Sequence, residues 1–228
     1  MIGIYDSAEV RDTANVIVIA DTLRICTARL DRVYAVADRI VCTEDLHIGR
    51  LRFVGDLMSG SVIEAEDASF VCTMLCHRFA AKKLKLSNAS PSTKAIVSRI
   101  TADDIRIGQL INQMPFAVRS ACFRAQHITN TGSIEADTIE SEDIESSGTI
   151  HAGEINCHVL YMKPPQHRSF FSSGISGNAL SQRERCSVIS VIRARKVFLE
   201  NVVCDCVIAS EIHPGRNCQI KRIIRTGL

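Results

Sequence analysis

The sequence predicts an all-β fold: a right-handed single-stranded β-helix, or β-solenoid, with a loop insertion near residues 160–187. Three observations support this prediction. A short strand motif recurs along the chain, β-branched residues are abundant, and helical three-and-four spacing of apolar residues appears only briefly, between Arg24 and Val36. Apolar residues make up 46% of the chain but aromatic residues only 5%, with no Trp, so the core must be built from thin aliphatic layers.

The repeated unit is an aliphatic or aromatic residue, any residue, an alanine, two further residues and another aliphatic residue. Its start has the period-2 alternation of a half-buried strand. The ten copies are centred on Ala20, Ala37, Ala65, Ala81, Ala102, Ala125, Ala136, Ala152, Ala194 and Ala209. We expect these strands to stack their inward side chains into a continuous aliphatic column.

The spacing of the alanines predicts where the coils are regular. Most neighbouring copies are 15 to 28 residues apart, which suits one turn of a β-helix. Ala125 and Ala136 are only 11 residues apart, so we expect them on different faces of one coil. The 42-residue gap after Ala152 holds a Pro/Gly/Ser-rich stretch, which predicts the insertion. These features divide the chain into an N-terminal segment, a solenoid with its insertion, and a basic tail: residues 1–14, 15–213 and 214–228.

Two copies of the motif also carry a glycine. Residues 132–139 (GSIEADTI) and 148–155 (GTIHAGEI) resemble the Gly-x-Ile-x-Ala-x-x-Val/Ile strand of the bactofilins, which are polymer-forming bacterial cytoskeletal proteins. The resemblance implies a triangular right-handed β-helix that joins end to end into filaments without nucleotide, lies at the inner membrane, and positions cell-wall or shape-determining proteins. The chain departs from the family pattern in its greater length, its ten cysteines and its insertion.

The ends of a solenoid give an independent reason to expect assembly, because its first and last coils expose unpaired backbone groups and an open slice of core. Apolar segments near both termini could serve as contact surfaces or simply be terminal strands. The candidate self-association residues are Val16, Ile17, Val18, Ile19, Ile220, Ile223 and Ile224.

Charge is distributed unevenly although the net charge is only +2. Residues 133–155 contain seven acids and no Lys or Arg, whereas residues 181–228 contain nine basic residues and four acids. We expect the two patches to attract each other between chains, with salt-sensitive contacts. Their members are Glu135, Asp137, Glu140, Glu142, Asp143 and Glu145 on the acidic side, and Arg193, Arg195, Lys196, Lys221, Arg222 and Arg225 on the basic side.

The cysteines invite a metal site, above all Cys204, Cys206, His213 and Cys218, but paired Cys-x-x-Cys knuckles are absent from the sequence. We therefore interpret the cysteines as small core residues. Adjacent Cys157 and His158 would point to opposite faces of a strand and cannot form a catalytic dyad. No catalytic residue, metal or cofactor is expected.

The sequence thus predicts a non-enzymatic scaffold that self-assembles through its ends. The start of the chain lacks a basic and apolar export segment, and no apolar run approaches the roughly 18 residues of a membrane span, so we expect a cytoplasmic protein. The small net charge gives no reason to expect a nucleic-acid partner, while peripheral membrane contact follows only from the resemblance and the basic tail. Two alternatives stay open: a β-helix enzyme acting on a glycan, and a monomeric solenoid that serves as a binding module.

Overall fold

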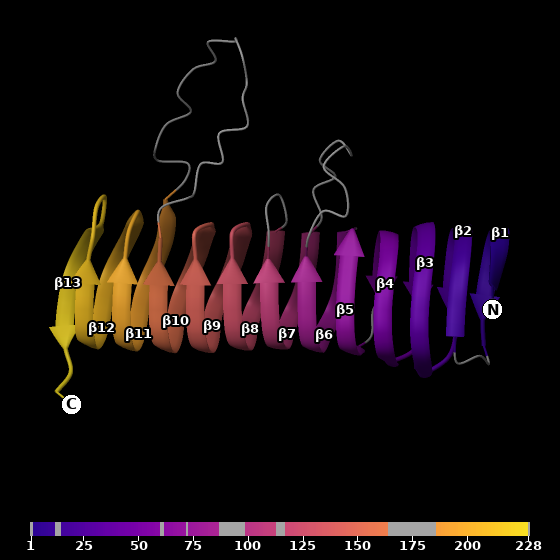
Figure 1. Ribbon diagram of the computed structural model, residues 1–228, viewed down its shortest axis with the longest axis horizontal. Coiled ribbons are helices and arrows are strands. Elements are labelled where there is room, and N and C mark those ends of the chain that lie inside the picture. Colours follow the sequence, from indigo (N-terminus) through magenta and orange to yellow (C-terminus); the bar gives the residue numbers. More distant parts are fainter. Residues whose placement is uncertain are drawn as a thin grey trace, which may run out of the picture.

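A computed structural model shows an all-β parallel solenoid of about ten turns, with the two termini at opposite ends of a rod (Figure 1). It describes residues 2–11, 15–59, 62–71, 73–86, 99–112, 117–163 and 186–227. Within these, thirteen strands follow one another in a single sheet, each parallel to the next. They are β1 (Ile2–Val10), β2 (Asn15–Ile25), β3 (Arg29–Cys42), β4 (Leu46–Ser59), β5 (Val62–Val71), β6 (Thr73–Leu86), β7 (Arg99–Asn112), β8 (Ala117–Asn130), β9 (Ser133–Ser146), β10 (Thr149–Met162), β11 (Ser187–Leu199), β12 (Val202–Pro214) and β13 (Gln219–Arg225).

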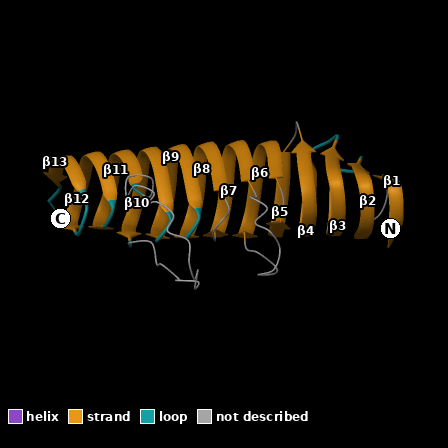
Figure 2. Ribbon diagram, turned by 90° about the horizontal axis from the view of Figure 1, so that it is seen from above, coloured by secondary structure: helices purple, strands orange, loops and turns teal. Residues whose placement is uncertain are grey.

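The long strands wrap around the rod, because intervals of two positions between inward residues are interrupted by intervals of three. In β8 the buried residues are Val118, Ser120, Phe123, Ala125, Ile128 and Asn130. An interval of two keeps the chain on one flat face, and an interval of three takes it around a bend before it points inward again. The register between β8, β9 and β10 repeats this pattern coil after coil (Figure 2).

The alanine motif therefore spans a bend: its first aliphatic residue and its alanine lie on one face, and its last residue lies on the next. Ala136 pairs with Ala152 in the neighbouring coil, as Ala194 pairs with Ala209. Ala125, however, pairs with Ser141 and lies on a different face from Ala136, which confirms the expectation drawn from their 11-residue spacing. The inward side chains of these strands do stack into a continuous aliphatic core, in which the alanines belong to ladders on several faces.

The hydrophobic core is a bundle of such inward ladders. One of them carries the bulkiest side chains and is fully buried along the rod. Its members with no exposed surface are Ile63, Phe79, Ile105, Phe123, Ile139, Ile155, Ile192 and Val207. Each of these side chains packs between its counterparts in the coils before and after it, which supplies the layered aliphatic packing that the composition predicts.

A second inward ladder is polar, and the sequence analysis did not predict it. The Asn112 side chain donates from Nδ2 to Oδ1 of Asn130 (2.8 Å), and Asn130 Nδ2 donates to Oγ of Ser146 (3.0 Å). Asn130 also accepts a hydrogen bond from the backbone N–H of Gly132 (3.1 Å) at the following turn. The Asn130 side chain thus joins three successive coils.

The sheet extends beyond the predicted solenoid boundaries of 15 and 213. Most of residues 1–14 form β1, which pairs with β2, and residues 219–225 of the predicted tail form β13, which pairs with β12. The predicted insertion is narrower than 160–187, because β10 continues to Met162 and β11 begins at Ser187. The greater part of it, residues 164–185, lies outside the described residues. No helix in the described part of the chain is long and apolar enough to cross a membrane.

Candidate functional site: the ends and outer faces of the rod

The N-terminal end of the rod is formed by β1 and not by the segment around residue 16. Because β1 covers β2, Val16 and Val18 are core residues with 0% and 2% exposure, so they cannot contact a partner as predicted. Ile17 and Ile19 point outward on a side of the rod and are about half exposed. The predicted contact surface at residues 16–19 is therefore corrected: half of it is core and the other half faces sideways.

One aromatic side chain partly covers this end. Tyr5 lies in the ladder of Ala20, and a Cβ placed on Gly3 would come within 2.6 Å of the Tyr5 ring. The ring thus lies against the glycine backbone, and this contact needs a residue without a side chain at position 3. The outer edge of β1 has no further strand beside it in the described part of the chain, so its backbone groups are available for pairing.

The C-terminal end is less complete. The last strand, β13, pairs with Val203–Ala209 of β12 and stops there. Ile220 packs against the core, whereas Ile223, in the inward ladder above Val207, remains 47% exposed. Ile224 points outward and is 40% exposed. Of the residues predicted at this end, Ile223 is the one that presents open core.

The two ends are in register with each other along the coil. Ile2 begins a ladder that continues through Ile17, Tyr34 and the following coils to Tyr161, Phe198 and His213. His213 lies four residues beyond Ala209, where the cover of β13 ends. Around the circumference of the rod, the place where β1 begins is thus close to the place where β13 ends.

The predicted acidic patch is on the outer surface, but its carboxylates are paired within the chain. Glu135 binds Arg119 (3.0 Å), and Glu140 binds Arg124 (2.7 Å). Asp143 and Glu142 likewise lie beside His127, Glu145 binds Lys163, and Glu154 binds Arg193. Neighbouring coils therefore supply much of the counter-charge that we had expected from another chain.

The predicted basic residues are distributed similarly. Lys196 binds Glu211 and Lys221 binds Asp205, at 2.8 and 2.7 Å. Arg222 donates to the sulfur of Cys206, while Arg195 and Arg225 are exposed. Exposed ion pairs of this kind contribute only about 0 to 1 kcal/mol each. They indicate which coils are neighbours and do not define a binding site.

No protein-family model, curated protein or solved structure matches this chain. Function must be argued from the surfaces of the rod.

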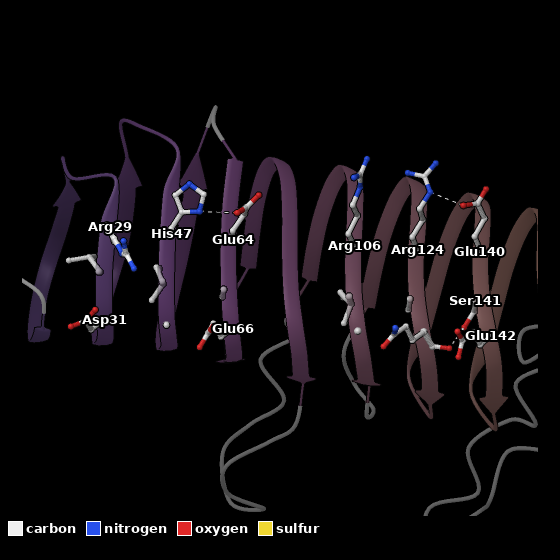
Figure 3. A pocket seen from close by; sticks show the side chains of 18 residues that line it. Arg29, Asp31, His47, Glu64, Glu66, Arg106, Arg124, Glu140, Ser141 and Glu142 are labelled. Atoms are coloured by element: carbon white, nitrogen blue, oxygen red, sulfur yellow. Dashed lines mark hydrogen bonds and ion pairs between the residues drawn. The ribbon is translucent and has the colours of Figure 1, made fainter.

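An open trough of about 1250 Å³ crosses several coils on one side of the rod (Figure 3). Arg29, Arg106 and Arg124 lie along one side of it, and Asp31, Glu66 and Glu142 lie along the other. Its other labelled carboxylates face cations: Glu64 binds His47 at 2.8 Å and Glu140 binds Arg124. A general acid or nucleophile would need a carboxylate that is not held in this way. The described residues that line the trough include no Phe, Tyr or Trp ring on which a sugar could stack.

Five cysteines of the described coils lie in or against the core: Cys42, Cys157, Cys204, Cys206 and Cys218. Cys204 and Cys206 are both buried, and Cys204 donates to the carbonyl of Cys206 (3.3 Å). His213 instead stacks on Phe198 outside the rod, with ring centroids 4.6 Å apart. The described residues contain no cluster of three or more His, Cys, Asp or Glu that could hold a metal ion. Burial raises the pKa of Cys42 and of Cys157 to about 12, so these thiols stay protonated and unreactive at neutral pH.

Proposed function

We propose that the protein is a non-enzymatic structural scaffold that self-assembles through its solenoid ends, as a bactofilin-like cytoskeletal polymer. Its first partner is another copy of itself. Cell-envelope or shape-determining proteins would bind along the resulting filament, in the cytoplasm or at its membrane. The rod is the building block, and its sides carry the positions at which such partners would be held.

The observation that carries the proposal is the register between the two ends. Since β13 leaves β12 uncovered after Ala209, a second copy placed on this end would set its Ile2 over His213 and continue the coil with β1 as the next strand. Main-chain hydrogen bonds between strand edges would join the two rods. The parallel pairing would be the same as within each chain.

Apolar surface at the C-terminal end supports the same arrangement. Ile223 belongs to the inward ladder of Val207 and Ile192, and Ile212 belongs to that of Val197, yet Ile223 is half exposed and Ile212 is only partly buried. A following coil would cover both side chains. Burying apolar area in this way contributes roughly 25 cal/mol per Å², which favours the joined state.

The test is the length of the particles in negative-stain electron microscopy and their mass in sedimentation, over a range of protein and salt concentrations. We expect rods several times longer than one solenoid. Ile223→Arg should shorten them to the length of one solenoid, because a charge would be buried at the junction. Val188→Arg is the matched control, since Val188 is equally exposed (50%) but lies on a side of the rod.

Two results would contradict the proposal. One is a particle of single-chain mass at every concentration, which would favour the monomeric binding module. The other is filaments whose length is the same in Ile223→Arg and in the wild type, because then the C-terminal core ladder would not form the junction.

A further inference from the structure

One outward face of strands β1–β4 is apolar, apart from Arg52, which lies on β4 beside Tyr34. In these strands the outward residues form two neighbouring ladders. One runs through Ile2, Ile17 and Tyr34, and the other through Ile4, Ile19, Val36 and Val54. Their exposed fractions are 77% and 80% for Ile2 and Ile4, and 36% to 52% for the others. We call these seven residues the lateral apolar face.

The lateral apolar face is not required by the fold. The ladder of Ile2 and Ile17 continues through Thr129 in β8 and Glu145 in β9, and the solenoid forms there equally well. Single exposed apolar residues are common on soluble proteins, but seven that adjoin in two ladders form a contiguous patch. Such a patch indicates a surface that is covered by something in the functional state.

Charged ladders border this face on both sides. On one side lie Arg32 and, in the next coil, Arg50. The Arg50 Nε atom also lies 3.9 Å from Oδ2 of Asp67. On the other side lie three exposed carboxylates in successive coils, those of Asp6, Asp21 and Asp38. Directly beside the face, the charged residues are thus arginines of β3 and β4 on one border and aspartates of β1 to β3 on the other; on β3, Asp31 and Arg39 lie one position farther out.

We infer that the lateral apolar face binds the same face of a second copy, with the two rods side by side and pointing in the same direction. The charged borders select this orientation. A twofold axis parallel to the rods brings the basic border of each copy opposite the acidic border of the other. A twofold axis across the rods, which would make them antiparallel, brings like charges together.

One strand contains both members of the expected contact. Arg32 and Asp38 are six residues apart on β3, and they lie at the same height on the rod. The parallel twofold axis passes between them, so Arg32 of each copy meets Asp38 of the other. Tyr34 and Val36, the outward residues between them, then pack across the axis.

The size of the face predicts a weak contact. Four strands spaced about 4.8 Å apart and six residues of about 3.3 Å each enclose roughly 20 by 20 Å on each copy. The total of about 800 Å² is below the roughly 1,200 Å² of stable interfaces, so dissociation constants in the micromolar range or weaker are expected. The contact does not rest on end-to-end assembly, because it uses a side of the rod.

The experiment is sedimentation equilibrium of the full chain in an Ile223→Arg background, which removes the proposed end contact. We expect a monomer–dimer equilibrium that Ile19→Lys weakens at least tenfold. Val188→Lys, an equally exposed position away from the face, should leave it unchanged. Circular dichroism checks that each variant is folded.

A charge swap tests the orientation separately. Arg32→Asp and Asp38→Arg should each weaken the dimer at least threefold, and the double variant should restore it, because each altered residue again meets its opposite charge. In an antiparallel dimer like charges would meet in every variant, so neither single exchange would weaken it.

Three outcomes would overturn the inference. The dimer could be insensitive to Ile19→Lys, or the double charge swap could fail to rescue it. The third outcome is a protein that stays monomeric in sedimentation but floats with phosphatidylcholine/phosphatidylglycerol vesicles, and no longer floats with them when it carries Ile19→Lys. In that case a membrane, and not a second copy, would cover the face.

Discussion

Replacing Asn130 by alanine should destabilise the rod far more than its single polar side chain suggests. The Asn130 side chain accepts hydrogen bonds from Asn112 and from the backbone N–H of Gly132, and it donates to Ser146 and to the carbonyl of Thr149. It is 1% exposed, so water cannot replace these partners.

The size of the destabilisation depends on which hydrogen bonds the partners of Asn130 keep when its side chain is removed. Asn112 still donates to the carbonyl of Ser133 (3.2 Å), and Ser146 still donates to that of Gly148 (3.4 Å). The buried N–H of Gly132 loses the side chain that holds it, which costs about 1–3 kcal/mol. Two lost donor bonds and the small cavity add about 1–2 kcal/mol. We therefore expect the free energy of unfolding to fall by about 3 kcal/mol.

The assay is urea unfolding followed by circular dichroism, with hydrogen exchange of β8 and β9 as a local readout because coils of a solenoid can open separately. Thr129→Ala, the exposed neighbour, should change stability by less than about 0.5 kcal/mol. Asn130→Ser should fall between the two, since Ser146 fills the same ladder in the next coil. If Asn130→Ala matched Thr129→Ala within error, the ladder would not hold the coils together and the reasoning would be refuted.

Three further perturbations test the packing. Phe123→Ala should cost about 3–5 kcal/mol in urea unfolding because the side chain is fully buried, whereas Arg124→Ala should cost less than 1 kcal/mol; equal costs would contradict the ladder. Gly148→Ala should cost about 1–3 kcal/mol and lower the melting temperature, since its Cβ would lie 2.1 Å from a carbonyl oxygen of the preceding coil, while Gly227→Ala meets no atom within 4 Å and should change nothing. Burial raises the pKa of Cys42 from 9.0 to about 12, so its contribution to stability is present below pH 9 and is lost as the pH rises toward 12. The free energy of unfolding should therefore fall less steeply between pH 9 and 12 in Cys42→Ala than in the wild type. Parallel curves of unfolding free energy against pH would contradict the burial of the thiol.

The alternation of apolar residues predicted the strands because every coil must bury its inward side chains, whatever face they occupy. For the same reason, the alternation could not predict which face of the rod each strand segment occupies. Ile134 with Ala136 and Phe123 with Ala125 satisfy one motif on two different sides of the rod, and the sequence pattern does not contain the bend that separates them. Only the pairing of coils determines which alanines stack.

The candidate contact surfaces were partly predictable for a related reason. Four consecutive apolar residues from Val16 to Ile19 indicate a strand near an end, but a strand sends alternate side chains to opposite sides. The run itself thus implies that two of the four face outward, which is the signal of the lateral apolar face. The alternation of Ile2 and Ile4 repeats this signal in β1. Buried Asn112 and Asn130 left no such signal, because a polar residue is stable inside only when the neighbouring coil offers it a partner.

The two proposed contacts act in perpendicular directions, and this fixes the form of the assembly they would make together. An end contact repeats without limit along the axis, whereas a twofold lateral contact is saturated by two copies. Because the lateral twofold axis is parallel to the rods, both rods of a pair point in the same direction and their ends lie at the same height. Each end contact then holds the next lateral faces at high effective concentration, so a weak lateral contact suffices. Ile19→Lys should therefore give thinner filaments of unchanged continuity, while Ile223→Arg should give isolated pairs. If both variants shortened the filaments equally, the two surfaces would not be independent.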